Sequence, residues 1–173
     1  YGFVDGVYWT LQLELSFYAA VLVVLLLGLQ RSLATLALAW PAAMLIARAL
    51  GVGELPYLGG YYSYFAAGML FALLKQGRQP LAWAGLAACL YLCIDFSTGR
   101  SLAFVEKKGV DYSLPVIAAL IVLQFAFFLV LNTRRGSDLE LPASRLAGGL
   151  TYPLYLVHAH IGYMALSRFG SDE

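Results

Sequence analysis

Long runs of apolar residues, separated by short polar stretches, dominate the chain. Six runs approach the roughly 20 residues that a helix needs to cross the hydrocarbon core of a membrane. Apolar and polar residues do not alternate with period two, so helices are the remaining way to satisfy the backbone in lipid. The pattern predicts an all-α bundle of about six transmembrane helices. The predicted spans are Val7–Leu29, Leu33–Leu50, Tyr57–Leu74, Leu81–Phe96, Leu114–Asn132 and Leu150–Ser167.

The positions of Lys and Arg suggest how the helices are oriented. The longest polar connection between the predicted spans is Ser97–Ser113. Cytoplasmic loops are enriched in basic residues, and short loops carry most of this signal. We predict that the first helix runs from outside to inside, since most of the basic residues on the other side lie in or beside the one long loop. The cytoplasmic residues would then be Arg31, Lys75, Arg78, Arg134, Arg135 and Arg145.

The composition agrees with a membrane protein. Hydrophobic residues make up 61% of the 173 residues and charged residues only 12%, whereas a soluble domain carries about 25% charged residues. A net charge of +1 without a basic run gives no indication of a nucleic-acid partner. Cys89 and Cys93, four residues apart in one apolar run, fit two buried thiols better than a disulfide. We interpret residues 1–173 as part of a single membrane domain.

The first predicted helix carries the clearest candidate for chemistry. Thr10, Glu14 and Tyr18 recur every four residues and share one stripe of the helix. Glu14 lies roughly 10 Å along the axis from the helix start. A carboxylate at membrane depth costs on the order of 2.5–3.5 kcal/mol on insertion scales unless it is paired or hydrated. Glu14 is therefore a candidate functional residue, and the alternative is an interhelical hydrogen-bond anchor.

The last predicted helix holds both histidines of the chain, His158 and His160. Thr151, Tyr155 and His158 fall on one helical face. His158 is a candidate general base or proton relay, although such a His can equally be a satisfied hydrogen-bonding group. The sequence contains no metal-ligand spacing, no phosphate-binding glycine loop and no G-x-S-x-G turn. No metal site is therefore expected.

Tyrosines crowd the outer end of the third predicted helix. They fit the aromatic belt found at membrane interfaces, although one or two could contact a substrate. Asp95, near the outer end of the fourth predicted helix, is interpreted as a solvated end residue. The tyrosines are Tyr57, Tyr61, Tyr62 and Tyr64.

Three stretches resemble signature segments of the acyltransferase-3 family of membrane O-acyltransferases. Tyr8–Tyr18 resembles the W-[ST]-L-x-x-E-x-x-F-Y signature, and Tyr64–Leu70 is similar to F-x-x-G-M-L. Leu150–His158 is similar to the closing S-Y-x-L-Y-L-V-H helix, from which Pro153 departs and is expected to kink the helix start. The stretches keep the family's order and cover nearly the whole chain.

The resemblance implies a larger fold of about ten transmembrane helices in the bacterial inner membrane. It implies transfer of an acyl group, often acetyl, from cytoplasmic acyl-coenzyme A to a hydroxyl of a carbohydrate or another envelope or exported acceptor. Acyl-coenzyme A is then a donor substrate, and no bound cofactor is expected. The family's Arg–His pair on its first helix has no match here. We interpret the chain as the later portion of the domain, completed by N-terminal helices and a last helix of the same polypeptide and inactive alone.

The resemblance also suggests roles for individual residues. A base must remove the hydroxyl proton and a further group must stabilise the oxyanion. The family's His, outside this chain, is the expected base, and Glu14 would orient it or stabilise its cation. His158 is the second catalytic candidate. The expected substrate-binding residues are Trp9, Thr10, Tyr18 and Tyr155.

Two other functions remain open at this point. In a proton-coupled transporter, Glu14 and His158 would belong to an ion path. Paired halves with helices broken in mid-membrane would favour that function, and only Pro41 fits this description. A non-catalytic membrane sensor or scaffold is the third possibility.

Overall fold

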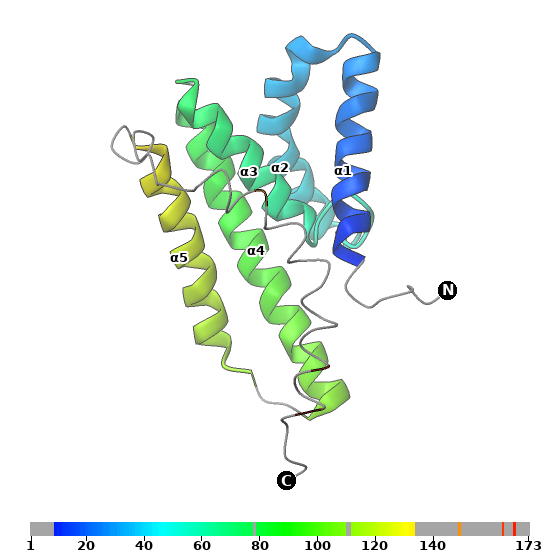
Figure 1. Cartoon of the computed structure of the whole chain (residues 1–173), viewed down its shortest axis with the longest axis vertical. Coiled ribbons are helices and arrows are strands. Elements are labelled where there is room, and N and C mark those ends of the chain that lie inside the picture. Colours follow the sequence, from blue (N-terminus) through cyan, green and yellow to red (C-terminus); the bar gives the residue numbers. More distant parts are fainter. Residues whose placement is uncertain are drawn as a thin grey trace. The chain divides into compact units, whose positions relative to one another are not determined.

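The computed structural model describes residues 9–77, 79–109 and 112–133, with the single positions 149, 164 and 168. Contacts divide the chain into two units, one of Leu15–Ser137 and one of Tyr1–Glu14 with Asp138–Glu173. The described residues contain α-helices and one 3-10 turn, and none of them forms a strand. The elements in Figure 1 are α1 (Trp9–Leu26), η1 (Gln30–Ser32), α2 (Leu33–Ala49), α3 (Tyr62–Lys75), α4 (Gln79–Lys108) and α5 (Leu114–Asn132).

The described helices confirm an all-α membrane bundle. Three of them are long and apolar enough to cross a membrane: Gln30–Ala49, Pro80–Lys107 and Leu114–Asn132. The apolar helix Thr10–Leu26 is shorter, and α3 has only 14 residues, against the roughly 20 that a span requires. Most of the sixth predicted span, Leu150–Ser167, lies outside the described residues. The number of six crossings therefore stays a prediction.

Two predicted boundaries were wrong. The third helix begins at Tyr62 rather than Tyr57, because Tyr57 and Gly60 adopt left-handed backbone angles that end regular helix. The polar stretch predicted as the long connection Ser97–Ser113 is helical as far as Lys108. Hydropathy marks where a helix leaves lipid, not where its backbone hydrogen bonding ends. The length of the apolar run therefore underestimated the length of α4.

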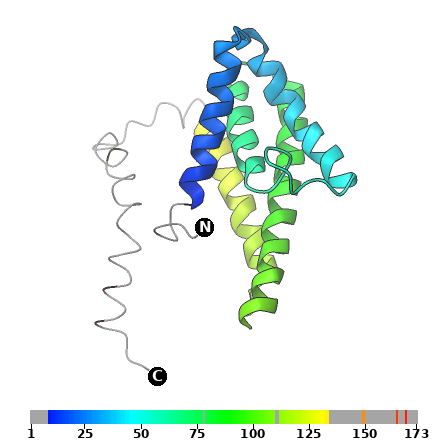
Figure 2. The same ribbon diagram turned by 90° about the vertical axis from the view of Figure 1, so that its right-hand side faces the viewer.

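Helices α2, α3, α4 and α5 form the packed part of the Leu15–Ser137 unit (Figures 1 and 2). α3 packs on α2, α4 and α5, and α4 also contacts α2 and α5. Small side chains allow close approach of helices in membranes, and much of the α3–α4 interface is built from them. The buried residues on these two helices include Ser63, Ala66, Ala67, Leu70, Ala82, Leu86, Cys89 and Cys93.

Both cysteines are buried free thiols, as the sequence predicted. The Cys93 thiol donates a hydrogen bond of 3.3 Å to the Ser63 hydroxyl across the α3–α4 interface. The Ser63 hydroxyl in turn donates to the Gly60 carbonyl oxygen at 2.7 Å. The hydroxyl of this fully buried serine is therefore satisfied within the protein.

An ion pair joins α2 to α4. The guanidinium Nη2 of Arg48 lies 2.5 Å from the carboxylate Oδ1 of Asp95. Asp95 lies well inside α4 rather than at its end, so the interpretation as a solvated end residue was wrong. Because the two side chains remain 47% and 29% exposed, we assign the pair a role in helix register more than in stability.

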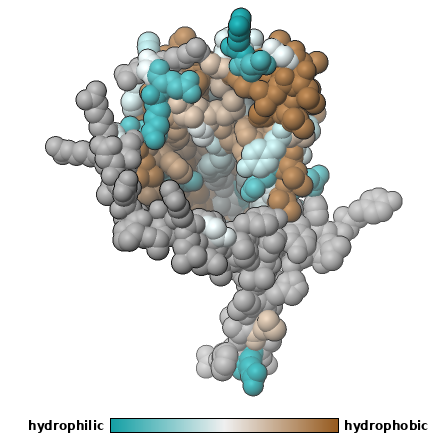
Figure 3. Space-filling view, turned by 45° about the horizontal axis from the view of Figure 1, so that its top comes forward, coloured by the Kyte–Doolittle hydropathy of each residue, from teal (hydrophilic) through white to brown (hydrophobic). Residues whose placement is uncertain are grey.

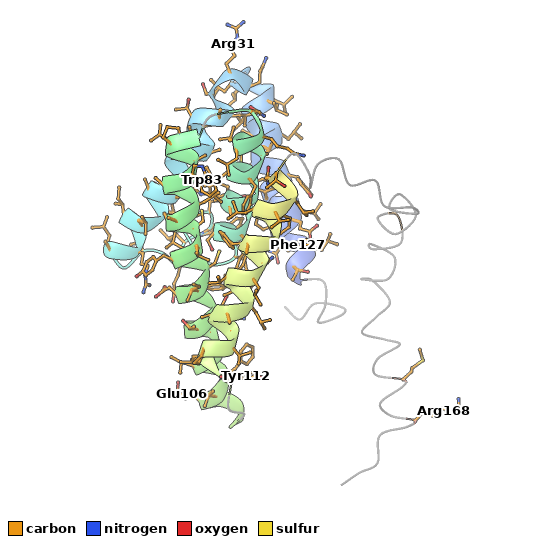
Figure 4. All side chains as sticks on the ribbon, turned by 90° about the vertical axis from the view of Figure 1, so that its left-hand side faces the viewer. Arg31, Trp83, Glu106, Tyr112, Phe127 and Arg168 are labelled. Carbon is orange, nitrogen blue, oxygen red and sulfur yellow. The ribbon has the colours of Figure 1, made fainter. Side chains whose placement is uncertain are left out.

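The outward surface of the described helices is suited to lipid. Leu120, Leu123 and Phe127 of α5 are exposed, and Figure 3 shows broad apolar areas on the surface of the described helices. Charged side chains such as Arg31 and Glu106 lie at opposite ends (Figure 4). An apolar middle between polar ends is the arrangement that a bilayer requires.

Candidate functional site

An apolar cleft lies between α1 and α2. Its volume is about 370 Å³, within the range of small-molecule sites in proteins. One wall comes from α1, the other from α2, and single residues are added by the α2–α3 loop and by α3. The lining residues are Phe17, Ala20, Val21, Val24, Leu33, Leu36, Ala37, Ala39, Trp40, Ala43, Tyr57 and Met69.

Two hydrogen bonds tie the α2–α3 loop to the cleft. The indole Nε1 of Trp40 donates to the backbone carbonyl oxygen of Tyr57 at 2.6 Å. The Tyr57 hydroxyl donates to the backbone carbonyl oxygen of Ser16 at 3.0 Å. The α2–α3 loop is thus bonded through one residue to both walls, α2 and α1. We call Phe17, Trp40 and Tyr57 the floor of the cleft.

Stacked aromatic rings support this floor. The Phe17 ring is parallel to Trp40, at 3° with centroids 6.1 Å apart, and stacks on Phe65 of α3 at 4.8 Å. The Tyr57 ring packs on Tyr62 at 4.6 Å. Pairs of this kind contribute about 0.5–1.5 kcal/mol each beyond the area they bury. The floor is therefore a rigid surface rather than a set of loose side chains.

The backbone of Tyr57 is strained. Its φ of 66° lies in the left-handed region, where a bulky residue other than glycine is a clear outlier. Such a conformation costs of order 1–3 kcal/mol and persists only when surrounding contacts impose it. Here the bonds to Trp40 and Ser16 impose it, which makes this loop a candidate functional element.

The loop closes on itself without room for a further carbon. A Cβ added to Gly59 would overlap the backbone carbonyl oxygen of Gly53. We expect Gly59→Ala to displace the loop and to lower the free energy of unfolding by about 1–3 kcal/mol. Thermal unfolding of the full-length protein in detergent measures this. Gly53→Ala is the matched control, since its Cβ would come no closer than 3.4 Å to a neighbour, and an equal effect of both changes would contradict the prediction.

The predicted acid lies on α1 as expected. α1 runs from Trp9 to Leu26, so Thr10, Glu14 and Tyr18 do share one helical stripe. Thr10 and Glu14 are half-buried, and Tyr18 is 59% exposed. Trp9 is the first residue of α1, and its side chain is outside the described part of the chain. The catalytic role of Glu14 and the substrate-binding roles of the other three stay predictions.

The other predicted site residues cannot be placed beside this stripe. His158 and Tyr155 lie outside the described residues. Glu14 and Thr10 belong to the unit of Tyr1–Glu14 and Asp138–Glu173, whereas the cleft belongs to Leu15–Ser137. Among the described residues, no group of three or more His, Cys, Asp or Glu residues could hold a metal ion.

The cleft was not predicted from the sequence. Tyr57 was interpreted as part of an interfacial belt but lines the cleft, and Tyr62 is buried rather than interfacial. One signal in the sequence could have drawn attention to Trp40. It directly precedes Pro41, and a helix rarely carries a proline in its interior. Nothing local in the sequence pairs Phe17 with Trp40 or Tyr57.

Two of the stretches that carry the resemblance meet at the cleft. Phe17, in Tyr8–Tyr18, and Met69, in Tyr64–Leu70, both line it. Phe65, in the second stretch, stacks on Phe17. The cleft is thus lined in part by residues of the stretches that resemble the family's signature segments.

Comparison with known proteins gives one finding. A family model for an acyltransferase domain, that of the acyltransferase-3 family, matches residues 1–172. No curated protein and no solved structure is a significant match. The match covers all three stretches that carry the resemblance.

Proposed function

Because the chain belongs to the acyltransferase-3 family, we propose that this integral membrane protein transfers an acyl group, acetyl in the simplest case, from acyl-coenzyme A to a hydroxyl of a carbohydrate or another envelope or exported acceptor. The match over residues 1–172 carries the proposal. Membrane acyl transfer is the activity of the family. The donor, the acceptor and a location in the bacterial inner membrane are the further parts that we propose.

The proposed reaction is a direct acyl transfer. The acceptor hydroxyl oxygen bonds to the thioester carbonyl carbon while its proton passes to a base. The tetrahedral oxyanion then collapses, the carbon–sulfur bond breaks, and coenzyme A leaves as a thiolate that takes up the proton. Hydrogen-bond donors placed at the oxyanion contribute most when water is excluded.

We propose that Glu14 acts on the base rather than on the acceptor. A carboxylate beside an imidazole holds it in one orientation and stabilises the cation formed when it takes the proton. The base is the His that the resemblance places outside this chain, and His158 is the candidate within it. Trp9, Thr10, Tyr18 and Tyr155 are proposed to bind the acceptor.

We propose that the donor enters at the end of the bundle that holds Arg31 and Lys75. The α1–α2 and α3–α4 connections lie at the same end of the bundle (Figure 1). Arg31 is in η1 of the first connection, and Lys75 is in the last turn of α3 before the second. Positive charge at this end favours the approach of the phosphates of coenzyme A.

The test uses the full-length protein reconstituted into liposomes. Acetyl-coenzyme A labelled in its acetyl group is supplied on one side with an envelope glycan, and both free thiol and labelled glycan are measured. We expect one thiol for each ester formed. Movement of substrate or protons across the membrane without thiol release would contradict the proposal and favour a transporter.

A further inference from the structure

Helix α1 is held to the bundle differently from the other helices. Helices α2, α3, α4 and α5 pack on one another at close backbone distance, and none of these interfaces among the described residues includes α1. A cleft of about 370 Å³ lies between α1 and α2. Close packing of helix on helix is the usual means of fixing a helix in a membrane. The position of α1 must therefore depend on individual side-chain contacts.

Two kinds of side-chain contact reach α1 at one point. The Tyr57 hydroxyl donates to the Ser16 backbone carbonyl oxygen at 3.0 Å. The ring of the next residue, Phe17, stacks on Trp40 and Phe65. The α2–α3 loop, α2 and α3 thus all meet α1 within one helical turn. A hydrogen bond weakens steeply with distance and angle, so it fixes the helix more narrowly than stacked rings do.

The loop end of this hydrogen bond is itself fixed. The carbonyl oxygen of Tyr57 accepts a hydrogen bond from the Trp40 indole of α2 at 2.6 Å. Its ring packs on Tyr62 of α3, with centroids 4.6 Å apart. Its φ of 66° is a strained value for a tyrosine, and such strain persists only where surrounding contacts impose it. Tyr57 is therefore held by α2 and α3 in the one conformation that presents its hydroxyl to α1.

We infer that Tyr57 is a positioning residue for acyl transfer: its hydroxyl bond to Ser16 fixes α1 on the bundle and thereby fixes the carboxylate of Glu14. The inference rests on the proposed function, including the role of Glu14. Glu14 precedes Ser16 by two residues in the same helix, about 3 Å along the axis. A shift of α1 at Ser16 therefore moves Glu14 by a similar distance, and a misplacement of about 1 Å can cost about 100-fold in rate.

Removal of the hydroxyl tests this inference. Tyr57→Phe keeps the ring on Tyr62 and removes the bond to Ser16. In the full-length protein in liposomes, with acetyl-coenzyme A and an envelope glycan, we expect kcat to fall about tenfold or more while KM for acetyl-coenzyme A changes little. Tyr112→Phe is the matched control, because it removes a hydroxyl from an exposed tyrosine between α4 and α5. Its kcat should equal that of the wild type.

A double-mutant cycle separates positioning of Glu14 from a general loss of structure. If Tyr57 acts through Glu14, Tyr57→Phe should change kcat by no more than about twofold in the Glu14→Gln background, because the carboxylate that it positions is already gone. A general structural defect would lower kcat by the same factor in both backgrounds. Equal factors would therefore overturn the inference.

A distance measurement tests the geometry independently of activity. Spin labels at Leu15→Cys on α1 and Ile46→Cys on α2, both exposed positions, report the separation of the two helices by double electron–electron resonance. The two native cysteines are buried and do not compete for the label. We expect Tyr57→Phe to broaden this distance distribution but not that of a reference pair, Ile46→Cys with Leu123→Cys, on the packed helices α2 and α5. An unchanged α1–α2 distribution would overturn the inference.

Failure of the inference and failure of the proposed function give different results. Normal kcat in Tyr57→Phe would overturn the inference and leave acyl transfer standing. Absence of thiol release by the wild type would instead contradict the proposed function. The α1–α2 distance would still decide whether the Tyr57 hydroxyl holds the helix.

Discussion

Glu14→Gln in the full-length protein is expected to lower kcat/KM for acyl transfer by about 100-fold or more. The substitution keeps the size of the side chain and removes its charge. A neutral amide cannot stabilise an imidazolium and can hold the ring in the wrong tautomer, and effects of this kind reach about 10²–10⁴-fold. Thiol release from acetyl-coenzyme A, in the presence and absence of acceptor, measures the change.

Further measurements distinguish a role of Glu14 in positioning the base from a purely structural role. A positioning role predicts that kcat falls more than KM rises, that the pH profile of kcat/KM shifts, and that Glu14→Asp restores part of the activity. Glu54→Gln is the matched control, because Glu54 is exposed in the α2–α3 loop and makes the same change of charge. Normal turnover in Glu14→Gln would remove Glu14 from the mechanism.

Gly85→Leu is expected to destabilise the helical bundle strongly. Gly85 is buried in α4, where an added Cβ would lie 2.8 Å from Cδ1 of Leu70 and 3.6 Å from Cγ of Pro41. Three helices, α2, α3 and α4, therefore meet closely at Gly85, where even a Cβ requires the buried Leu70 side chain to shift and a leucine needs far more space. Overpacking of a dense core costs about 1–3 kcal/mol and occasionally more. The thermal unfolding midpoint in detergent or nanodiscs measures this loss.

The control for this prediction lies on the same helix. Gly99 is exposed in α4, and a Cβ there would meet no atom of the described residues within 4 Å. Gly99→Leu should leave stability unchanged or raise it, since leucine favours helix over glycine by up to about 1 kcal/mol. If Gly85→Leu unfolds at the same temperature as Gly99→Leu, the close approach of the three helices is not as tight as described.

Hydropathy alone predicted the first and last residues of those helices that begin and end where the apolar sequence does. α5 begins and ends where the sequence predicted, at Leu114 and Asn132, because a helix of that length and polarity satisfies its own backbone in lipid. α1 and α2 agree with their predicted spans to within a few residues of the described chain. The family could also be recognised from short stretches, since signature residues keep their spacing within single helices.

The first residue of α3 and the last residue of α4 could not be predicted from hydropathy alone. The sequence Tyr57–Tyr61 is apolar enough to continue a helix, yet Tyr57 is bonded out of helical geometry by Trp40 and Ser16. α4 continues beyond Phe96 into polar sequence, where local hydrogen bonding sustains the helix without a hydrophobic pattern. In both cases a contact or a backbone preference determines the result, and the hydrophobic pattern cannot show either.

The sequence by itself determined that this protein is an all-α membrane acyltransferase of known family, and that α1 carries an acid and two other polar residues on one stripe. Both follow from spacing along single helices, where each residue's neighbours are fixed by the helical repeat. Only the tertiary structure decided the cleft, its floor and the Arg48–Asp95 ion pair. These features join residues that are far apart in the chain, and their contacts depend on how whole helices and one strained loop pack against each other.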